Sequence, residues 1–182
     1  MTSAEHPTLI LLCGLPGSGK TTSAKRLAEL VPAVRLCPDE WMTDLGLDPY
    51  DEPARDRLEK RLWSHAQELL GLGRSVILEY GFWGRRERDE KRLAAREFGV
   101  PVELHYLTAS LDELSERIKS RTAEGTWGAV PVTRDMLEEY AEQFEAPTDD
   151  ELALFDRPPP DRQAVEPGAR ISAAVDVRLR AR

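Results

Sequence analysis

Hydrophobic and polar positions follow two different periods along this chain. Short apolar runs that are typical of buried strands lie at residues 8–13, 34–37, 76–79 and 102–107. Between and after them, at 58–69, 93–98, 111–118 and 133–144, apolar residues recur every three or four positions, which is the spacing of one helix face. Strands that alternate with helices predict a parallel sheet with helices on both faces. The predicted fold class is therefore α/β.

The regular pattern ends near residue 147. A Pro-Pro-Pro run and a later Pro-Gly pair predict a loop or disordered chain up to about residue 170. Apolar residues then alternate at 171–179, which favours an edge strand, and the arginines near the end are interpreted as a solvated basic tail. We therefore predict a domain at 1–146 and a proline-rich C-terminal segment at 147–182.

Composition and net charge restrict the function classes. At 182 residues, with 41% apolar and 32% charged residues, the chain suits one soluble domain. The net charge of −8 is opposite to the basic footprint of nucleic-acid binders and argues against a polynucleotide partner. No stretch approaches the roughly 20 apolar residues of a membrane helix, and the first residues lack a signal-peptide layout. We expect a cytoplasmic protein without a membrane partner.

A phosphate-binding loop follows the first predicted strand. Residues 14–21 read Gly-Leu-Pro-Gly-Ser-Gly-Lys-Thr, the complete G-x-x-x-x-G-K-[ST] pattern, between a strand and an amphipathic helix at 23–30. Glycines let backbone N–H groups turn toward a polyphosphate, Lys20 reaches its β- and γ-phosphates, and the hydroxyl of Thr21 ligates Mg²⁺. The expected nucleotide contacts are Gly14, Gly17, Ser18, Gly19, Lys20, Thr21 and Thr22.

Absent motifs narrow the reaction. The chain has no Asn-Lys-x-Asp run for guanine, no Leu-Ser-Gly-Gly-Gln transporter signature, and too few residues for the extra helical domain of a ring ATPase. Three glycines within the loop are typical of small phosphotransferases. We therefore predict a kinase that uses ATP and Mg²⁺, with Lys20 among its catalytic residues.

An acidic residue follows the second predicted strand. Because ligands of parallel α/β sheets bind beyond the carboxyl ends of the strands, Asp39 should face the same crevice as the phosphate-binding loop. There it would accept a proton from an acceptor hydroxyl or join the shell of Mg²⁺. The alternative is that Asp39 only caps the helix that starts at Glu40, and one side chain can serve both roles. Glu40 itself is the weaker candidate.

The third predicted strand ends at Glu79, beside the strand of the phosphate-binding loop in the usual order of such sheets. A carboxylate at this position orients Mg²⁺ through water or contacts the acceptor. Phe82 and Trp83 follow, between two glycines. They would form an apolar wall for a small acceptor, and core packing is the alternative.

Two arginines lie on the helix that begins with the capping box of Ser110 and Glu113. Arg117 and Arg121 are four residues apart, so they project from one side of the helix and can converge on phosphate. The segment 122–132 has the place of a lid, from which an arginine stabilises the charge on a transferring phosphoryl group. The alternative is a pair of surface arginines without a role.

Other charged residues have weaker claims to a site. Arg134 is a third candidate for the lid role. The run at 85–92 mixes basic and acidic residues and is interpreted as a solvated helix face, although Arg85 and Arg86 could reach an anionic substrate. The three histidines share no ligand spacing, so we assign them no chemistry.

Together these residues resemble a known group of enzymes. The loop at 14–22, Asp39, Glu79 and the arginine helix with its lid resemble the P-loop kinases of the polynucleotide kinase, chloramphenicol phosphotransferase and zeta-toxin group. The resemblance is to single-domain bacterial members that are described as AAA-like ATP-binding proteins, and it covers residues 8 to about 145. It implies a P-loop NTPase fold, a general-base role for Asp39 and lid roles for the two arginines.

One departure bears on the substrate. The polynucleotide kinases carry an arginine three residues beyond the base, whereas this chain has Met42. With the acidic composition, this argues against a DNA or RNA 5′ end. We therefore predict transfer of the γ-phosphate of ATP to a hydroxyl of a small molecule. The alternatives are a polynucleotide 5′-hydroxyl kinase and a non-catalytic ATP-binding switch.

Overall fold

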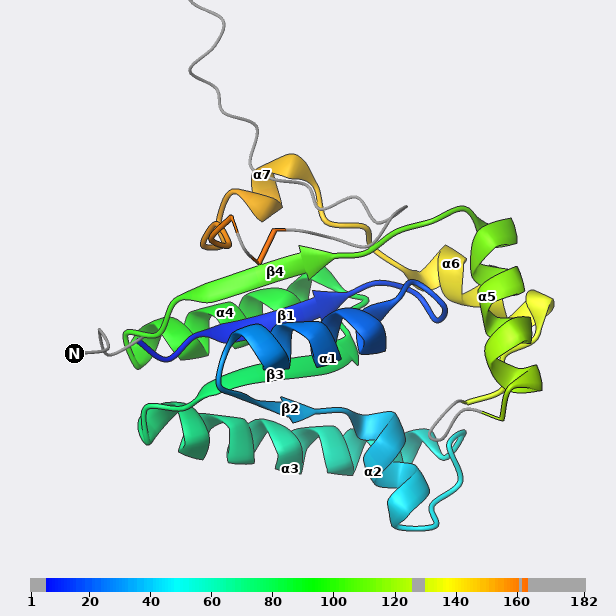
Figure 1. Cartoon of the computed structure of the whole chain (residues 1–182), viewed down its shortest axis with the longest axis horizontal. Coiled ribbons are helices and arrows are strands. Elements are labelled where there is room, and N and C mark those ends of the chain that lie inside the picture. The colour runs from blue at the N-terminus through cyan, green and yellow to red at the C-terminus, as the bar shows by residue number, and fades with distance from the viewer. Residues whose placement is uncertain (1–5, 126–129, 161, 164–182) are drawn as a thin grey trace, which may run out of the picture.

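The computed structural model describes residues 6–125, 130–160 and 162–163. Its centre is a sheet of four parallel strands in the order β2-β3-β1-β4 (Figure 1). The strands are β1 (Leu9–Cys13), β2 (Ala33–Leu36), β3 (Ser75–Gly81) and β4 (Val102–Tyr106). Each strand coincides closely with one of the predicted apolar runs.

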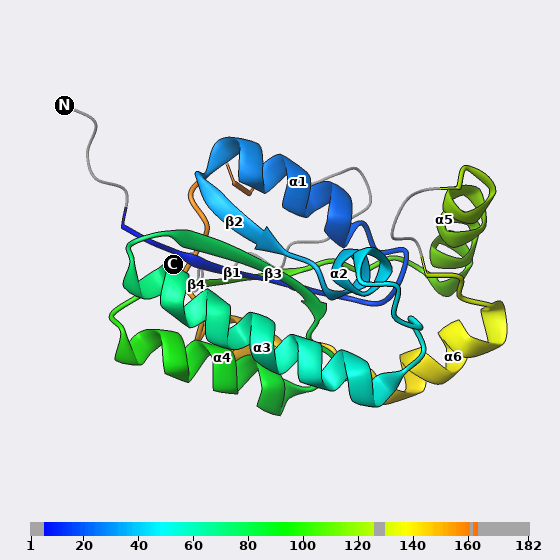
Figure 2. The same ribbon diagram turned by 90° about the horizontal axis from the view of Figure 1, so that it is seen from below.

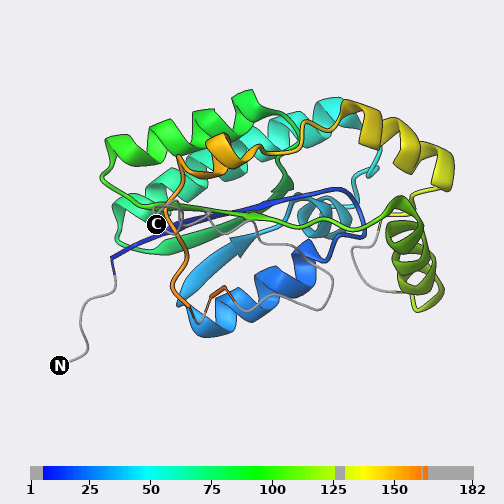
Figure 3. The same cartoon turned by 90° about the horizontal axis from the view of Figure 1, so that it is seen from above.

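Helices cover both faces of the sheet. On one face lies α1 (Lys20–Leu30), and on the other lie α3 (Glu52–Gly71) and α4 (Arg85–Glu97) (Figure 2 and Figure 3). Beyond the carboxyl ends of the strands gather α2 (Pro38–Asp44), α5 (Leu111–Ala123) and α6 (Arg134–Gln143) (Figure 1). The predicted α/β fold is confirmed. In the described part of the chain, no helix combines the length and apolar character needed to cross a membrane.

The central strand β1 carries the phosphate-binding loop and is buried from end to end. Leu9 and Leu11 join the core under α3 and α4, whereas Ile10 and Leu12 pack against α1. A strand buried on both faces has a continuous apolar sequence, as found here. The loop after β1 therefore starts from a fixed point in the middle of the molecule.

The C-terminal segment packs more closely than its composition predicts. It contains a short helix, α7 (Asp149–Leu152), and both Leu152 and Phe155 are buried in the core on the α3 and α4 side. Asp156 exchanges two hydrogen bonds of 2.7 Å with the backbone of Val102. The prediction of an irregular segment is wrong for this stretch, because a few apolar side chains in a polar segment hardly change its composition. The predicted edge strand at 171–179 lies outside the described residues.

The mixed-charge run forms α4, and part of it is buried. Arg88 has no exposed surface: its Nε and Nη2 donate to the carboxylate of Glu151 at 2.6 and 2.9 Å, and its Nη1 donates to the carbonyl of Phe82 at 2.8 Å. Lys91 is buried with its ammonium 4.9 Å from the ring centroid of Trp63. The prediction of a solvated face is wrong at Arg88 and Lys91, because α7 supplies a carboxylate from far along the sequence.

Candidate active site

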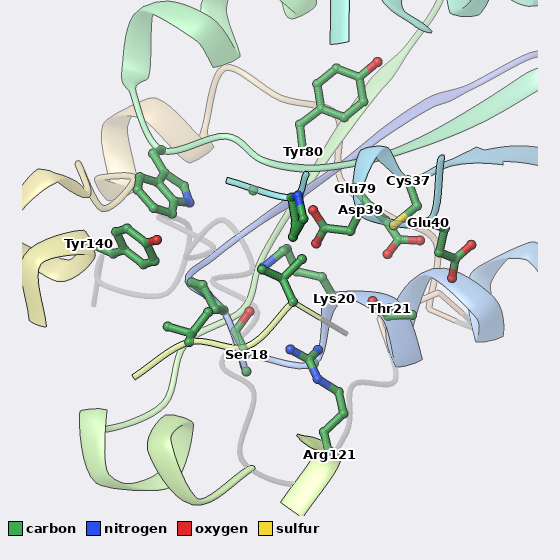
Figure 4. A pocket seen from close by; sticks show the side chains of 18 of the residues that line it. Ser18, Lys20, Thr21, Cys37, Asp39, Glu40, Glu79, Tyr80, Arg121 and Tyr140 are labelled. Atoms are coloured by element: carbon green, nitrogen blue, oxygen red, sulfur yellow. The ribbon is translucent and has the colours of Figure 1, made fainter. Parts of the chain in front are cut away.

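A cavity of about 1220 Å³ opens at the carboxyl ends of the strands (Figure 4). This is the edge at which parallel α/β sheets bind ligands. Its walls come from the phosphate-binding loop, α2, the start of α3, the end of β3, α5 and α6. The predicted site residues that line it are Gly17, Ser18, Gly19, Lys20, Thr21, Thr22, Asp39, Glu79, Trp83, Arg117 and Arg121.

The glycines of the loop are required by close packing. A Cβ atom on Gly14 would lie 2.4 Å from the carbonyl oxygen of Leu107, and one on Gly17 would lie 2.8 Å from that of Leu114. Gly17 also has a φ of +79°, in the left-handed region that favours glycine. Gly14 does not line the cavity. Its carbonyl accepts a hydrogen bond from Lys20, and its contact with a nucleotide stays a prediction.

Polar groups of the phosphate-binding loop and of the start of α1 are available to bind a ligand. Lys20 donates from Nζ to the carbonyls of Gly14 and Leu15, both at 2.9 Å, and desolvation in the cleft lowers its pKa. Ser18 is 3% exposed, and its hydroxyl has no hydrogen-bond partner among the described residues. Helix α1 starts at Lys20 without a side-chain cap, so its first N–H groups are open to an anion.

Arg121 extends from α5 toward the phosphate-binding loop (Figure 4). Its Nε is buried, and no atom of the described chain accepts a hydrogen bond from it. Arg117 also lines the cavity, from an exposed position. Arg134 is not part of the cavity wall, because it pairs with Asp112 and Glu138 at 2.7 Å each. The structure thus brings two of the three candidate arginines to the cavity.

Asp39 lies in the first turn of α2 and lines the cavity. The residue at the N-cap is Cys37, so the alternative that Asp39 only caps this helix is wrong. Its Oδ1 accepts a hydrogen bond of 2.5 Å from Nη2 of Arg55, which comes from α3. Sequence analysis missed Arg55. A weak signal was available, because Glu59 lies four residues further along the same helix, at the spacing of an ion pair.

Glu79 lies at the cavity wall with a side chain that is 2% exposed. It is paired with Arg35 of β2, and the same guanidinium donates to Glu40 at 2.5 Å. Sequence analysis also missed Arg35. A charged residue inside a short apolar strand is the signal that could have revealed it, because such a residue needs a partner.

The two aromatic candidates, Phe82 and Trp83, lie in different environments. Phe82 is fully buried, adopts a φ of +50° and stacks on Tyr80 at 5.4 Å between ring centroids. Its predicted substrate role is wrong, because this backbone turn directs the ring into the core. Trp83 lines the cavity and packs against Tyr140 of α6, with the ring centroids 4.9 Å apart. The pocket interpretation holds for Trp83, and Tyr140 was missed.

Two carboxylates that the sequence did not indicate complete this wall. Glu59 of α3 and Glu87 of α4 both line the cavity. Burial raises the pKa of Glu87 to about 7, and the nearby charge of Glu59 adds to the shift. Burial also raises the pKa of Glu59, against the opposing effect of Arg55. Two acidic groups with raised pKa values in one cavity are a common mark of a functional site.

The mouth of the cavity is bordered by the predicted lid. Tyr50 donates from its hydroxyl to the carbonyl of Pro131 at 2.5 Å, and Val130 and Val132 line the cavity. These contacts connect the chain after α2 with the chain before α6. Residues 126–129 lie outside the described part, so closure of the lid over a nucleotide stays a prediction.

Comparisons with known proteins agree with this geometry. A family model described as an AAA domain matches residues 9–147. The chain is 32% identical over 119 residues to a protein of Aeropyrum pernix described as a probable adenylyl-sulfate kinase, a match that covers 62% of this chain and 65% of that protein. Among solved structures, a gluconokinase from Sinorhizobium meliloti is 22% identical with a TM-score of 0.54, and 78% of this chain and 77% of that chain are covered.

A second solved structure, Kti12 of Chaetomium thermophilum in complex with ADP-AlF3, is 20% identical with a TM-score of 0.62, and 78% of this chain and 82% of that chain are covered. At such low identity the structures demonstrate a shared fold. The chain spans about two thirds of the length of the Aeropyrum relative. The resemblance to P-loop kinases is confirmed at the level of the family and the fold.

Proposed function

The chain belongs to the AAA-domain family, and from this membership and the cavity geometry we propose that it is an ATP- and Mg²⁺-dependent phosphotransferase. The acceptor is a hydroxyl group of a small molecule. The observation that carries the proposal is the position of Asp39 in the same cavity as the phosphate-binding loop and Arg121. A proton acceptor and a phosphate site in one enclosed space are what phosphoryl transfer to a hydroxyl requires.

The nucleotide end supplies positive charge and hydrogen-bond donors. Lys20 leaves the carbonyls of the loop and bonds to the β- and γ-phosphates when they are present. The Ser18 hydroxyl and the Nε of Arg121 are donors at the same end without partners among the residues that the structure describes, so an anion there would satisfy two buried polar groups. Arg121 then stabilises the negative charge that develops on the transferring phosphoryl group.

The residues at this end also fit Mg²⁺. The hydroxyl of Thr21 lines the cavity beside Lys20, and the carboxylates of Asp39 and Glu79 lie across from it (Figure 4). Oxygen ligands of this kind suit Mg²⁺, which keeps several waters and takes most of its other ligands from phosphates. Because Glu79 is already paired with Arg35, we assign it contact through water. Bound Mg²⁺ supplies charge neutralisation on the phosphates.

Asp39 performs the proton transfer in this proposal. Its carboxylate accepts the proton of the acceptor hydroxyl, whose oxygen forms a bond to the γ-phosphorus while the bond between that phosphorus and the bridging oxygen breaks. ADP leaves with the electrons of the broken bond. Arg55 fixes the orientation of Asp39 through one carboxylate oxygen, which leaves the second oxygen for the hydroxyl.

The test is a product screen with ATP labelled in the γ-phosphate. The purified protein is incubated with Mg²⁺ and pools of hydroxylated metabolites, and mass spectrometry identifies compounds that gain phosphate. Lys20→Ala removes the charge on the β- and γ-phosphates and should lower transfer at least tenfold. Lys119→Ala is the matched control, because Lys119 lies exposed on α5 and, within the described chain, pairs with Glu116 alone.

Each remaining outcome of the screen favours an alternative. Label on an oligonucleotide in preference to every small molecule would support a polynucleotide 5′-hydroxyl kinase. Tight ATP binding without any phosphorylated product would support a nucleotide-dependent switch. Full transfer by a folded Lys20→Ala protein would overturn the proposed role of the phosphate-binding loop.

A further inference from the structure

The cavity has opposite charges at its two ends. The cations Lys20, Lys25, Arg117 and Arg121 line the end formed by α1 and α5, together with one acid, Glu124. The acids Glu52, Glu59, Glu87 and Glu139 line the end formed by α3, α4 and α6. Since a nucleotide occupies the cationic end in the proposed function, the acidic end is the part that remains for the acceptor.

The two arginines near the acidic end are already paired, each with two carboxylates. Arg55 donates to Asp39 at 2.5 Å and to Glu59 at 3.5 Å, so one guanidinium is shared between two carboxylates. Glu79 and Glu40 share the guanidinium of Arg35. These pairs account for both arginines, and neither has charge left to neutralise a further acid.

Glu87 is left without a partner. In the described part of the chain, its carboxylate makes no hydrogen bond and no ion pair. The cations nearest to it along α4 are committed elsewhere: Lys91 pairs with Glu90 at 2.7 Å, and Arg88 is bonded to Glu151 and Phe82. A half-buried carboxylate without a partner costs stability unless a ligand compensates it.

The same end of the cavity has aromatic walls. Trp83 and Tyr140 pack on each other and line the cavity, and Tyr80 lines it beside the two acids. Burial raises the pKa of the Tyr80 hydroxyl, and the nearby negative charges of Glu59 and Glu87 add to the rise, so the three groups lie close together. Ring faces and carboxylates attract the same kind of ligand, an organic cation.

The cavity also shows independent signs that it receives a ligand. Ser18 belongs to the loop that lines the cavity, and its hydroxyl is almost fully buried and lacks a partner among the described residues (Figure 4). The buried Nε of Arg121, at the same end, also has no partner in the described part of the chain. The unpartnered groups at the nucleotide end are donors, and the unpartnered group at the other end is an acceptor.

We infer that the acceptor carries an amino group, protonated at neutral pH, in addition to the hydroxyl that receives the phosphate. This inference rests on the proposed function, and it names the acceptor class: amino sugars, aminocyclitols or amino alcohols. The ammonium lies between Glu59 and Glu87 against the ring of Trp83, and the reacting hydroxyl lies at Asp39. Because Arg55 bridges Asp39 and Glu59, the two subsites lie on either side of one guanidinium group, a separation that a single sugar ring can span.

The test compares acceptors that share a skeleton and differ in charge. Glucosamine, glucose and gluconate form one series, and 2-deoxystreptamine and myo-inositol form another, each with labelled ATP and Mg²⁺ at pH 7.5. We expect kcat/KM for the amine of each series to exceed that of its neutral and anionic counterparts at least tenfold. In Glu87→Gln this preference, the ratio of kcat/KM for the amine to that of its counterparts, should be about tenfold smaller. Glu97→Gln is the control on the same helix, because Glu97 is exposed and outside the cavity.

A binding measurement separates this inference from the proposed function. Calorimetry with a non-hydrolysable ATP analogue and Mg²⁺ measures the affinity of each amine, which should fall in Glu87→Gln and stay constant in Glu97→Gln. Binding that depends on Glu87 without any transfer would support the acceptor class and contradict the kinase. Transfer that favours glucose, myo-inositol or gluconate, or equal behaviour of the two variants, would overturn the amine and leave the kinase intact. Amines that neither bind nor react would also overturn it.

Discussion

The nucleotide end and the acceptor end of the cavity are built in different ways. The nucleotide end comes from one continuous stretch, residues 16–25, joined by two arginines of α5. The acceptor end is assembled from side chains on α2, α3, α4, α6 and the end of β3. A continuous stretch binds phosphate largely through its backbone, which any sequence with the right glycines provides. The dispersed end can change its side chains, and hence its ligand, without altering the sheet.

The two ends also differ in what holds them in place. The phosphate-binding loop is fixed by β1, which is buried on both faces of the sheet. The turn that carries Trp83 depends on the C-terminal segment: Arg88 bonds both to the carbonyl of Phe82 and to Glu151, and Glu145 donates its backbone N–H to the carbonyl of Trp83 at 2.9 Å. The acceptor end thus relies on residues more than sixty positions away.

The substitution with the largest expected effect disables the acceptor end and leaves the nucleotide end intact. Asp39→Asn keeps the size of the side chain and an oxygen for Arg55 but cannot accept a proton. Phosphoryl transfer should fall by about 10²- to 10⁴-fold, the range for loss of a general base, while ATP affinity by calorimetry stays within a factor of a few. Asp44→Asn, at the end of the same helix and outside the cavity, should leave both unchanged. Full transfer by Asp39→Asn would assign the base to another group.

A comparable substitution at the nucleotide end should act on the transition state. Arg121→Ala removes a donor that is buried beside the phosphate-binding loop, so kcat should fall about 10²- to 10³-fold with a much smaller rise in KM for ATP. The control is Arg134→Ala, which removes an arginine that is paired outside the cavity. A higher KM with unchanged kcat would instead make Arg121 a ground-state clamp.

The next effect tests whether the C-terminal segment supports the acceptor end. Arg88→Met leaves the buried carboxylate of Glu151 without its partner, and unfolding by urea should show a loss of about 3 kcal/mol. The double variant Arg88→Met with Glu151→Leu should recover part of this loss, because no buried charge remains unpaired. Equal stability of both variants would contradict this reading. The same variants should lower transfer more than ATP affinity, since the nucleotide end does not touch this pair.

The contrast between the two ends explains which parts of the fold and of the site could be predicted from the sequence. The strands, the capping box at Ser110 and the phosphate-binding loop follow local rules: apolar runs, a cap spacing and a glycine pattern. Asp39 and Glu79 could be placed in the cavity because they follow strands whose carboxyl ends meet at one edge of the sheet. Arg121 could be placed near the phosphate-binding loop because it lies on the helix that follows the last predicted strand and precedes the predicted lid.

The missed residues have only weak local signals. The carboxylates that give Arg35 and Arg55 their place in the site, Glu79 and Asp39, lie on other elements. Glu87 is one charge within a mixed run and differs from its neighbours only because α4 turns it toward α3. Phe82 and Trp83 are adjacent in sequence, and the positive φ angles of Gly81 and Phe82 turn the backbone so that one ring enters the core and the other lines the cavity.

The smallest expected effect concerns the charge of the acceptor end and is measured as stability against pH. The pKa of Glu87 is raised from its ordinary value to about 7 by burial and by Glu59, while Lys91 and Arg88 oppose the shift and Glu90 adds to it. Between pH 4.5 and pH 7 the folded protein therefore keeps a proton that the unfolded chain releases. Stability falls as the pH rises through this window, and the full loss is present above pH 7.

Glu87→Gln has no proton to lose at this position, so it should be more stable than wild type at pH 8 and nearly equal at pH 4. We expect a difference of about 1–2 kcal/mol at pH 8, reduced from the full linkage value because Glu87 is only half-buried. The contribution of Glu59 is present in both proteins and largely cancels when their urea unfolding curves are subtracted. Glu97→Gln, at the exposed end of α4, should follow wild type at every pH. Parallel curves for wild type and Glu87→Gln would mean that this carboxylate is well solvated, and they would remove the energetic argument for a compensating cation.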